Sequence, residues 1–115
     1  MSHERIEALR AMAEAQPEEV MVWYGLANEY FKLERWSEAA AALRRVVALN
    51  PDYTSAYQML GTSLGNLGER EEARRVWAEG IKVADRTGAW KARQHMEGLL
   101  AETAGGEQGN GLCVE

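Results

Sequence analysis

The sequence has few of the residues that usually carry chemistry. Its 115 residues include one cysteine, Cys113, and two histidines, His3 and His95. A lone cysteine excludes an internal disulfide framework, and no cluster of histidine, cysteine and carboxylate residues has the spacing of a metal site. No base stands at a fixed position beside Cys113, so a nucleophilic role is not expected. We therefore expect no enzyme activity, no metal and no cofactor.

Long apolar runs and an excess of positive charge are also missing. No apolar run approaches the roughly 20 residues that cross a bilayer, and the charges spread through residues 1–12 are unlike a secretory signal. The 13 basic and 18 acidic residues leave a net charge of −5, which disfavours a phosphate backbone as the main partner. The interleaved charges of residues 69–75 indicate a solvated helix face. These absences predict a cytoplasmic protein that binds neither nucleic acid nor membranes.

Proline occurs only at Pro17 and Pro51, which are 34 residues apart. Side chains of similar character recur along the chain at the same interval. A self-similar period of this length predicts a solenoid of stacked supersecondary units. Each unit touches only its neighbours and leaves a long face open, so such proteins usually work by offering a surface. The clearest matching pairs are Trp23 and Tyr57, Leu26 and Leu60, Ala27 and Gly61, Ala39 and Ala73, and Leu43 and Trp77.

Apolar residues at spacings of three and four predict two helices in each unit. The short link Glu34-Arg35 makes the first pair an antiparallel hairpin, and Gly68 ends the corresponding helix of the second pair. The flanking segments look like halves of the same unit, and the last of them covers the second unit as a cap. We expect an all-α, antiparallel helix-hairpin solenoid in a single domain, residues 1–102, followed by a flexible glycine-rich tail, residues 103–115. The expected helices span about residues 3–15, 20–33, 37–49, 54–67, 70–84 and 89–102, and the two units span about residues 20–53 and 54–87.

The repeated positions resemble the motif of the tetratricopeptide repeat, W-x₂-L-G-x₂-Y, then A-x₃-F, then P. The resemblance is strong over residues 17–84, although Asp85 stands where a third proline would be. Small residues occupy positions where two helices approach closely, and large residues fill the space between helices. The first unit reads Trp23, Leu26, Ala27, Tyr30, Ala39, Leu43 and Pro51, and the second reads Tyr57, Leu60, Gly61, Leu64, Ala73 and Trp77.

This resemblance implies a binding surface. In the family, the first helix of each unit lines a concave groove that holds an extended peptide or a partner helix. The groove positions transferred to this chain carry one formal charge, Lys32, beside amides that pair with an extended backbone and methionines that adapt to apolar side chains. The ten implied groove residues are Met21, Tyr24, Asn28, Phe31, Lys32, Ser55, Gln58, Met59, Thr62 and Asn66, and Gly25 and Gly65 occupy two further groove positions.

One branch of the family clamps the terminal carboxylate of its partner with lysine, arginine and asparagine side chains. Here Asn28 matches an asparagine of that clamp, but Tyr24 and Met59 stand where a lysine and a second asparagine would be. The clamp is therefore expected to be mostly absent. The implied ligand is instead a neutral to mildly acidic, partly apolar peptide.

Two side chains keep alternative interpretations. Phe31 either anchors a ligand in the groove or packs against a neighbouring helix. Trp90 either covers the end of the second unit or stays exposed for a partner. The favoured function is a non-enzymatic adaptor that binds a peptide segment of a partner protein. The alternative is a structural role as a homo-oligomer that associates through the exposed ends of the solenoid.

Overall fold

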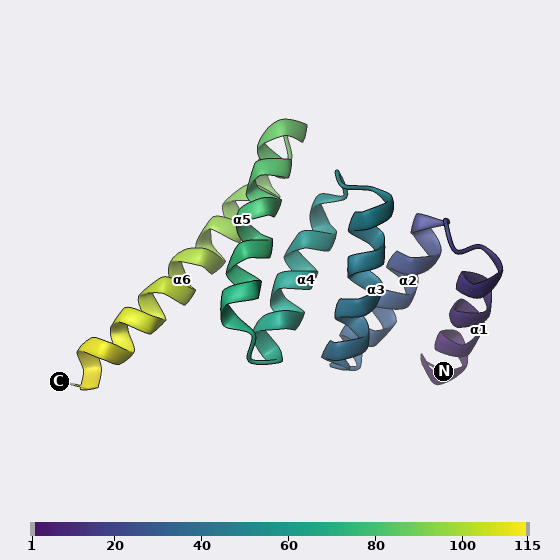
Figure 1. Cartoon of the computed structure of the whole chain (residues 1–115), viewed down its shortest axis with the longest axis horizontal. Helices are drawn as coiled ribbons and strands as arrows, with labels where there is room; N and C mark the ends of the chain where they lie inside the picture. The colour runs from purple at the N-terminus through teal and green to yellow at the C-terminus, as the bar shows by residue number, and fades with distance from the viewer. Residues whose placement is uncertain (1, 115) are drawn as a thin grey trace.

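The computed structural model describes residues 2–114, with side chains for residues 3–103 (Figure 1). Within that range the chain forms six α-helices and no strand, which confirms the expected all-α class. None of these helices combines the length and the hydrophobicity that a bilayer crossing requires. The helices are α1 (Ser2–Ala15), α2 (Val20–Lys32), α3 (Trp36–Leu49), α4 (Thr54–Asn66), α5 (Arg70–Thr87) and α6 (Trp90–Val114).

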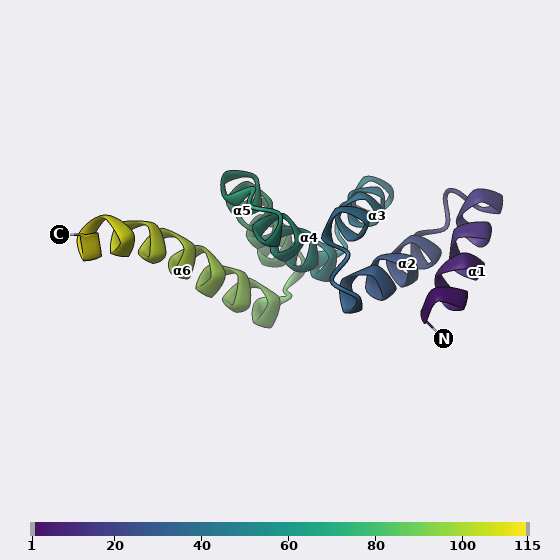
Figure 2. The same cartoon turned by 90° about the horizontal axis from the view of Figure 1, so that it is seen from below.

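The helices lie in two rows. Each helix packs against the next along the chain, and α2 with α3 and α4 with α5 form the most extensive contacts, as expected for hairpins. We call α2, α4 and α6 the A row, because α4 also contacts both α2 and α6. We call α1, α3 and α5 the B row; among the described residues no member of this row packs directly against another. Figure 2 shows α3 and α5 on one side of the molecule and α2 and α4 on the other.

The links inside the two hairpins have the same geometry. Glu34 has a φ of 59° and Gly68, its equivalent 34 residues later, has a φ of 86°. In both links the residue that follows donates its backbone N–H to a carbonyl five residues earlier, at 2.9 Å. The predicted role of Gly68 in ending its helix is confirmed. The first unit places a glutamate in the same left-handed conformation.

Helix α5 is one turn longer than the sequence predicts. It was expected to end at residue 84, but it continues to Thr87 and ends at Gly88, which has a φ of 80°. The reason lies at Asp85, where the first two units would lead one to expect a proline. A proline would remove a helical hydrogen bond and clash with the preceding turn, whereas aspartate lets the helix continue.

Close helix approaches set the core. A Cβ on Gly61 would lie 2.1 Å from Nε1 of Trp77, so only glycine leaves room for the indole. A Cβ on Gly80 would lie 2.6 Å from Sδ of Met96 and 2.7 Å from Cβ of Tyr57. Sequence reasoning assigned the role of Gly61 but did not single out Gly80. Both glycines bring α4, α5 and α6 into one apolar cluster.

Helix α6 covers the second unit, and its predicted apolar face does pack on the core. Trp90, in contrast, is 63% exposed, with the ammonium of Lys91 6.0 Å from its ring centroid. Backbone helix continues to Val114, beyond the predicted end at residue 102. The side chains of residues 104–115 lie outside the described part of the chain, so a flexible tail stays a prediction. The core-facing residues are Ala89, just before α6, and Ala92, Met96, Leu99 and Leu100 on it.

Candidate protein-interaction site

The ten implied groove residues all lie on α2 and α4, which are neighbours in the A row. Four of them are exposed, with Met21 the most open at 62%. The other six are half-buried. The face of the A row is therefore accessible on the side of the molecule that the resemblance indicates. The exposed four are Met21, Asn28, Lys32 and Asn66, and the half-buried six are Tyr24, Phe31, Ser55, Gln58, Met59 and Thr62.

Three of these residues meet at the junction of α2 and α4. The hydroxyl groups of Tyr24 and Ser55 are 3.2 Å apart, within hydrogen-bond distance. The Tyr24 ring lies 4.7 Å from the ring of Tyr53, centroid to centroid. The Tyr53 hydroxyl donates to Sδ of Met21 at 3.8 Å. We call Met21, Tyr24, Tyr53 and Ser55 the tyrosine cluster; it joins two units through aromatic and polar contacts.

Sequence reasoning missed Tyr53. It lies in the link before α4, and its equivalent in the first unit is Glu19, so the repeat pattern carries no signal for it. Burial raises the pKa of the Tyr53 phenol, with a further contribution from Tyr24. The phenol is thus held as a neutral donor, in keeping with its hydrogen bond to sulfur.

Three other groove residues are engaged within their own hairpin. Phe31 packs edge-to-face on Trp36 with centroids 5.1 Å apart, the local packing that was left open above. Nζ of Lys32 lies 3.4 Å from Oε2 of Glu29. Nδ2 of Asn66 donates to the backbone carbonyl of Thr62 at 2.9 Å. The structure therefore does not gather the ten residues into a single pocket.

Glu29 is a second residue that sequence reasoning missed. It is only 4% exposed, and besides Lys32 its carboxylate meets Nε of Arg5 from α1 at 2.9 Å. Both cations are largely exposed, so the pair lies at the edge of the α1–α2 interface. Removing a cation from a buried carboxylate is costly. Glu29 therefore links α1 to α2, and its ion pair with Lys32 neutralises the one formal charge among the groove residues.

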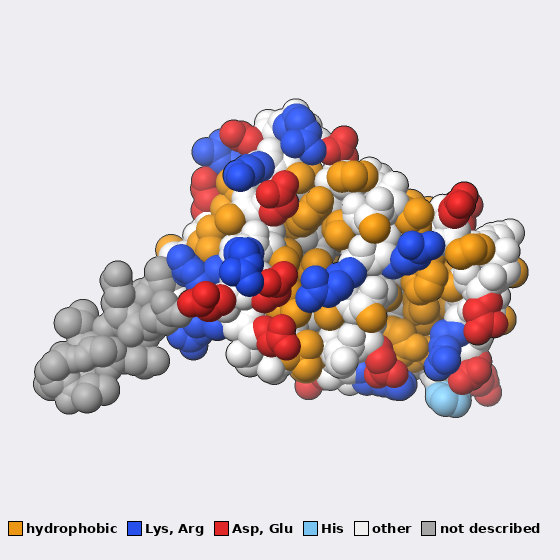
Figure 3. Space-filling view, in the orientation of Figure 1, with side chains coloured by type: hydrophobic (Ala, Val, Ile, Leu, Met, Phe, Trp, Pro, Cys, Tyr) orange, Lys and Arg blue, Asp and Glu red, His pale blue; other side chains and the backbone are white. Residues whose placement is uncertain are grey.

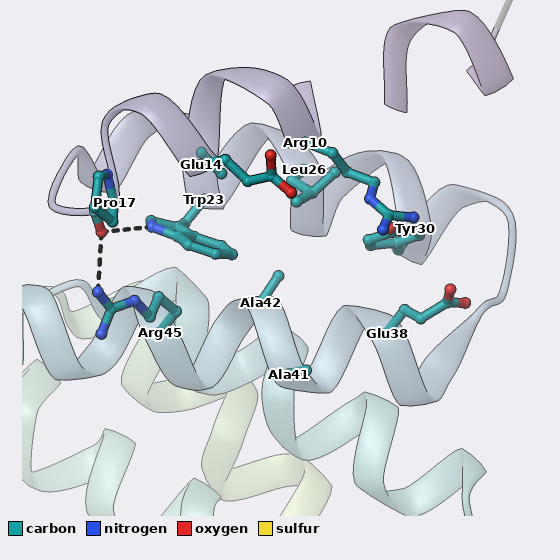
Figure 4. Close-up of a pocket in the computed structure, with 11 residues that line it drawn as sticks. Arg10, Glu14, Pro17, Trp23, Leu26, Tyr30, Glu38, Ala41, Ala42 and Arg45 are labelled. Atoms are coloured by element: carbon teal, nitrogen blue, oxygen red, sulfur yellow. Dashed lines mark hydrogen bonds between the residues drawn. The ribbon is translucent and has the colours of Figure 1, made fainter. Parts of the chain in front are cut away.

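A hollow lies on the other face, between α1 and α3, and has a volume of about 610 Å³. Helix α2 supplies its floor, which consists of Trp23, Leu26 and Tyr30. Figure 4 shows these three side chains lying between α1 and α3. We call this hollow the first trough. Its remaining lining is Arg10, Ala13 and Glu14 from α1, Pro17 from the turn, and Glu38, Ala41, Ala42 and Arg45 from α3.

At one end of the first trough, the backbone carbonyl of Pro17 accepts two side-chain hydrogen bonds. Nε1 of Trp23 donates to it at 2.8 Å and Nη2 of Arg45 donates to it at 3.1 Å (Figure 4). The Arg45 guanidinium also lies 5.6 Å from the Trp23 ring centroid, a cation–π distance. The second unit has the equivalent bond, since the Tyr57 hydroxyl donates to the carbonyl of Pro51 at 2.8 Å. A polar tip on the aromatic residue thus anchors each unit to the proline before it.

A second trough repeats the first between α3 and α5, again with a volume of about 610 Å³. Its floor includes Tyr57 and Leu60, the equivalents of Trp23 and Leu26. Figure 3 shows this face of the molecule, where hydrophobic side chains gather between the helices and charged side chains lie across them. The two troughs share a floor pattern and differ in their rims.

An ion-pair chain crosses the second trough. Glu72 of α5 meets Nη1 of Arg44, on α3, at 3.9 Å and Nη2 of Arg75 at 2.7 Å. The hydrogen bond from Arg75 lowers the pKa of Glu72, so this carboxylate stays charged at neutral pH. In the first trough the equivalent carboxylate, Glu38, is bound instead by Arg35, in the link just before α3, at 2.6 and 2.7 Å. No ion pair with α1 crosses the first trough in the part of the chain that the structure describes.

None of the ten implied groove residues lines either trough. Sequence reasoning assigned Trp23, Leu26 and Tyr30 to the core alone. The available signal was in α3, where Ala41 and Ala42 stand at positions that hold Arg75 and Val76 in the second unit. Small side chains at these positions widen the rim.

The fold and these surfaces define a class of protein: an antiparallel helix-hairpin repeat protein whose open faces serve protein–protein interaction. The profile of the tetratricopeptide repeat matches residues 20–53. A tetratricopeptide repeat domain protein from Salinibacter ruber is 30% identical, with a TM-score of 0.71 over 78% of this chain and 91% of that one. The chain belongs to the tetratricopeptide-repeat family, as the motif predicted.

Other relatives span very different lengths. A TPR repeat-containing protein of Pseudomonas aeruginosa is 28% identical over 95 residues, which are 83% of this chain and 90% of that protein. The human TPR and ankyrin repeat-containing protein 1 is 33% identical over 61 residues, 53% of this chain but only 2% of that protein. The TPR2B domain of yeast Sti1, solved as a complex with pHsp70, has a TM-score of 0.77, with 86% of this chain and 79% of that chain covered. Its 17% identity shows a shared fold alone.

Proposed function

We propose that this protein is a non-enzymatic adaptor that binds a peptide segment of a partner protein on the face of the A row. The tyrosine cluster carries the proposal, because it presents aromatic, thioether and hydroxyl groups at a junction of two units. Rigid aromatic side chains with a polar tip are frequent anchors of protein interfaces. The exposed Met21 gives this cluster an adaptable apolar edge.

The charges of the A row support a ligand with little charge of its own. Lys32 is paired with Glu29, and Arg93 of α6 is paired with both Asp85, at 2.8 Å, and Glu97, at 3.0 Å. These cations already have carboxylate partners, so a ligand would have to compete for them. The surface therefore suits a neutral to mildly acidic, partly apolar peptide.

A terminal carboxylate is not part of the proposed recognition. Yeast Sti1 shows that this fold holds a pHsp70 partner. In this chain Tyr24 and Met59 replace two groups that would clamp a carboxylate, and Arg93 is engaged by its own neighbours. A peptide ending in Glu-Glu-Val-Asp should bind no better than its amidated form. A strong preference for the free carboxylate would contradict this part of the proposal.

The test compares partner capture by the intact chain and by the double variant Met21→Ala/Asn28→Ala, with mass spectrometry of the bound proteins. Both side chains are exposed, so the variant should keep its helicity and melting temperature while its partners are lost. Leu67→Ala is the matched control, since it removes an exposed apolar side chain that belongs to no proposed site. Equal capture by the double variant would move the binding site away from the A row.

A second candidate function is self-association through the amino-terminal end of the solenoid. The observation behind it is Met12, which is 47% exposed although its equivalent Val46 is fully buried. Val46 lies on α3, which packs against both α2 and α4, whereas the described residues of α1 pack against α2 alone. Light scattering over a range of concentrations tests this function: a dimer that Met12→Glu dissociates would support it, and a monomer throughout would remove it.

The proposal also keeps the expected location and chemistry. We propose a cytoplasmic protein without a cofactor, bound to neither nucleic acid nor membranes. Among residues 3–103, whose side chains the structure describes, no group of three histidine, cysteine or carboxylate side chains is placed to hold a metal ion. Family membership supports an interaction role, and no residue has been assigned a catalytic one.

A further inference from the structure

We propose that the first trough is a second protein-binding site, and that its occupant is an acidic, amphipathic segment of a partner protein. This site lies between α1 and α3, on the face of the B row. It shares no residue with the tyrosine cluster or with the ten groove residues. It is therefore independent of the proposed function and adds a second point of attachment.

The shape of the trough fits a short stretch of polypeptide. Its floor runs from Trp23 to Tyr30, two turns of α2, which is roughly 10 Å of helix at 1.5 Å per residue. The walls facing each other over Leu26 are small, with Ala13 on α1 and Ala42 on α3. Figure 4 shows the space above the floor between these helices, with the aromatic rings at its two ends. Apolar side chains of a ligand would meet two aromatic rings and a leucine there.

The second trough shows how the rim charges of such a site can be satisfied within the chain. It has the same volume and an equivalent floor, and Glu72 pairs with Arg44 and Arg75 at its rim. Among the described residues the rim of the first trough has no such pairing between its two helices, and Ala41 takes the place of Arg75 there. The two troughs therefore differ in the charges left at their rims.

The charge of Arg10 at the rim of the first trough indicates which kind of ligand would bind there. Arg10 is the equivalent of Arg44, but its potential partner Glu38 is bound by Arg35, and Arg10 makes no ion pair with the described residues. Figure 4 shows Arg10 beside Tyr30 at one end of the trough and Glu14 and Arg45, of opposite charge, nearer the other end. An acidic side chain of the ligand would give Arg10 the carboxylate that Arg44 already has. The ligand should therefore carry an aspartate or glutamate close to aromatic or aliphatic residues.

A library of random dodecapeptides displayed on phage, panned on the full chain, tests this inference. Enriched peptides are then measured by fluorescence polarisation against four variants. Ala41→Arg adds a long charged side chain to the rim of the first trough, at the position that holds Arg75 in the second, and Arg10→Glu reverses the rim charge without adding bulk. Ala48→Arg, the same change at an exposed site of α3 outside the trough, is the matched control. Met21→Ala/Asn28→Ala reports on the A row.

Support would be a group of acidic, amphipathic peptides whose binding falls about tenfold or more, the loss of one anchoring contact, with Ala41→Arg and with Arg10→Glu. The same peptides should be insensitive to Ala48→Arg and to the A-row variant. Circular dichroism confirms that each variant is folded; if Ala41→Arg is not, Arg10→Glu alone decides.

Other outcomes overturn the inference in different ways. Peptides that respond only to the A-row variant would leave the proposed function standing and remove the trough as a site. Peptides that respond to Ala41→Arg but carry no acidic residue would overturn the chemistry assigned to the occupant. A dimer of the free chain that Ala41→Arg dissociates would identify the occupant as a second copy. Enrichment of no peptide at all would count against the trough and the A row together.

Discussion

At the scale of single residues, the two units solve one packing problem with different pairs of side chains. The first unit uses Ala27 with Leu43, and the second uses Gly61 with Trp77 at the equivalent positions. The indole occupies the space that a methyl group on Gly61 would need, since that Cβ would lie 2.1 Å from Nε1. A larger side chain at one position of the pair is therefore accommodated by a smaller residue at the other.

We expect Gly61→Ala to lower the free energy of unfolding by about 1–3 kcal/mol, the usual cost of overpacking. Combining it with Trp77→Leu recreates the pair of the first unit and should recover part of that loss. Urea denaturation of both single variants and the double variant gives the coupling between the sites. Additive effects of the two changes would show that the Gly61–Trp77 contact is not the cause.

A second residue-scale prediction uses the two hairpin links. Left-handed backbone costs a side chain such as that of Glu34 roughly 1–2 kcal/mol but costs glycine little. Glu34→Gly should therefore stabilise the protein by up to about 1 kcal/mol after its greater freedom in the unfolded chain is included. Gly68→Ala should have the opposite sign. Thermal unfolding of both variants checks the pair, and an equal sign for the two would contradict the explanation from φ.

Much of the residue-scale pattern could be predicted because a repeat compares the sequence with itself. The shift of 34 residues aligned Trp23 with Tyr57 and Ala27 with Gly61, and these positions are buried or half-buried as expected. Glu29 and Gly80 could not be found this way. Their roles depend on Arg5 and Met96, which lie on helices outside the two repeated units.

At the scale of helices, the chain departs from its own repeat where α5 passes Asp85. Helix α3 ends before Pro51, and α1, which corresponds to the second helix of a unit, ends before Pro17. Helix α5 instead continues to Thr87, and Asp85 uses the added turn to bind Arg93 of α6 at 2.8 Å. The extra turn therefore belongs to the attachment of the last helix.

A proline at position 85 would match the repeat motif and should nevertheless destabilise the protein. Asp85→Pro removes a hydrogen bond within α5 and clashes with the preceding turn, at a cost of about 3 kcal/mol. Asp85→Ala is the control; it loses only the exposed pair with Arg93, so its effect should be small. Guanidinium denaturation measures both variants. A neutral Asp85→Pro would show that the last turn of α5 is dispensable.

Helix starts, and the ends of the first five helices, were predictable to about one turn, whereas the end of α6 and the contacts of the candidate site were not. Periodicity identified all six helices, because each buries an apolar stripe on its neighbours. The ten implied groove residues lie on α2 and α4, and their role in binding stays a prediction; of these residues, Phe31 contacts Trp36 and Lys32 pairs with Glu29. Periodicity states which face of a helix is open, but the partner of a side chain depends on tertiary contacts.

At the scale of the whole molecule, stability depends on the cover that α6 gives to the second unit. Met96 is fully buried and packs over Gly80, and Nη1 of Arg74 donates to the carbonyl of Leu100 at 3.0 Å. These contacts, made by side chains that the structure describes, lie in the first four turns of α6.

Ending the chain after Thr103 should leave the melting temperature unchanged, because the buried contacts of α6 remain. Ending it after Ala84 removes them and exposes a few hundred Å² of apolar surface, which costs several kcal/mol at about 25 cal/mol per Å². That is a large share of the stability of a small domain. We expect the shorter chain to melt much lower or to aggregate, as measured by calorimetry and light scattering. A monomer with unchanged melting would mean that α6 is not a cap.

The wide spacing of the helices within the B row has a mechanical consequence. Bending the solenoid toward or away from this face must narrow or widen the troughs, since in the described part of the chain α1, α3 and α5 pack closely on A-row helices and not on one another. The Arg44–Glu72 pair acts as a weak tie across the second gap, and the first gap has no tie with α1. The spacing between α1 and α3 should therefore vary more easily than the spacing between α3 and α5. A ligand bound between α1 and α3 would restrict that movement and change the curvature of the A-row face.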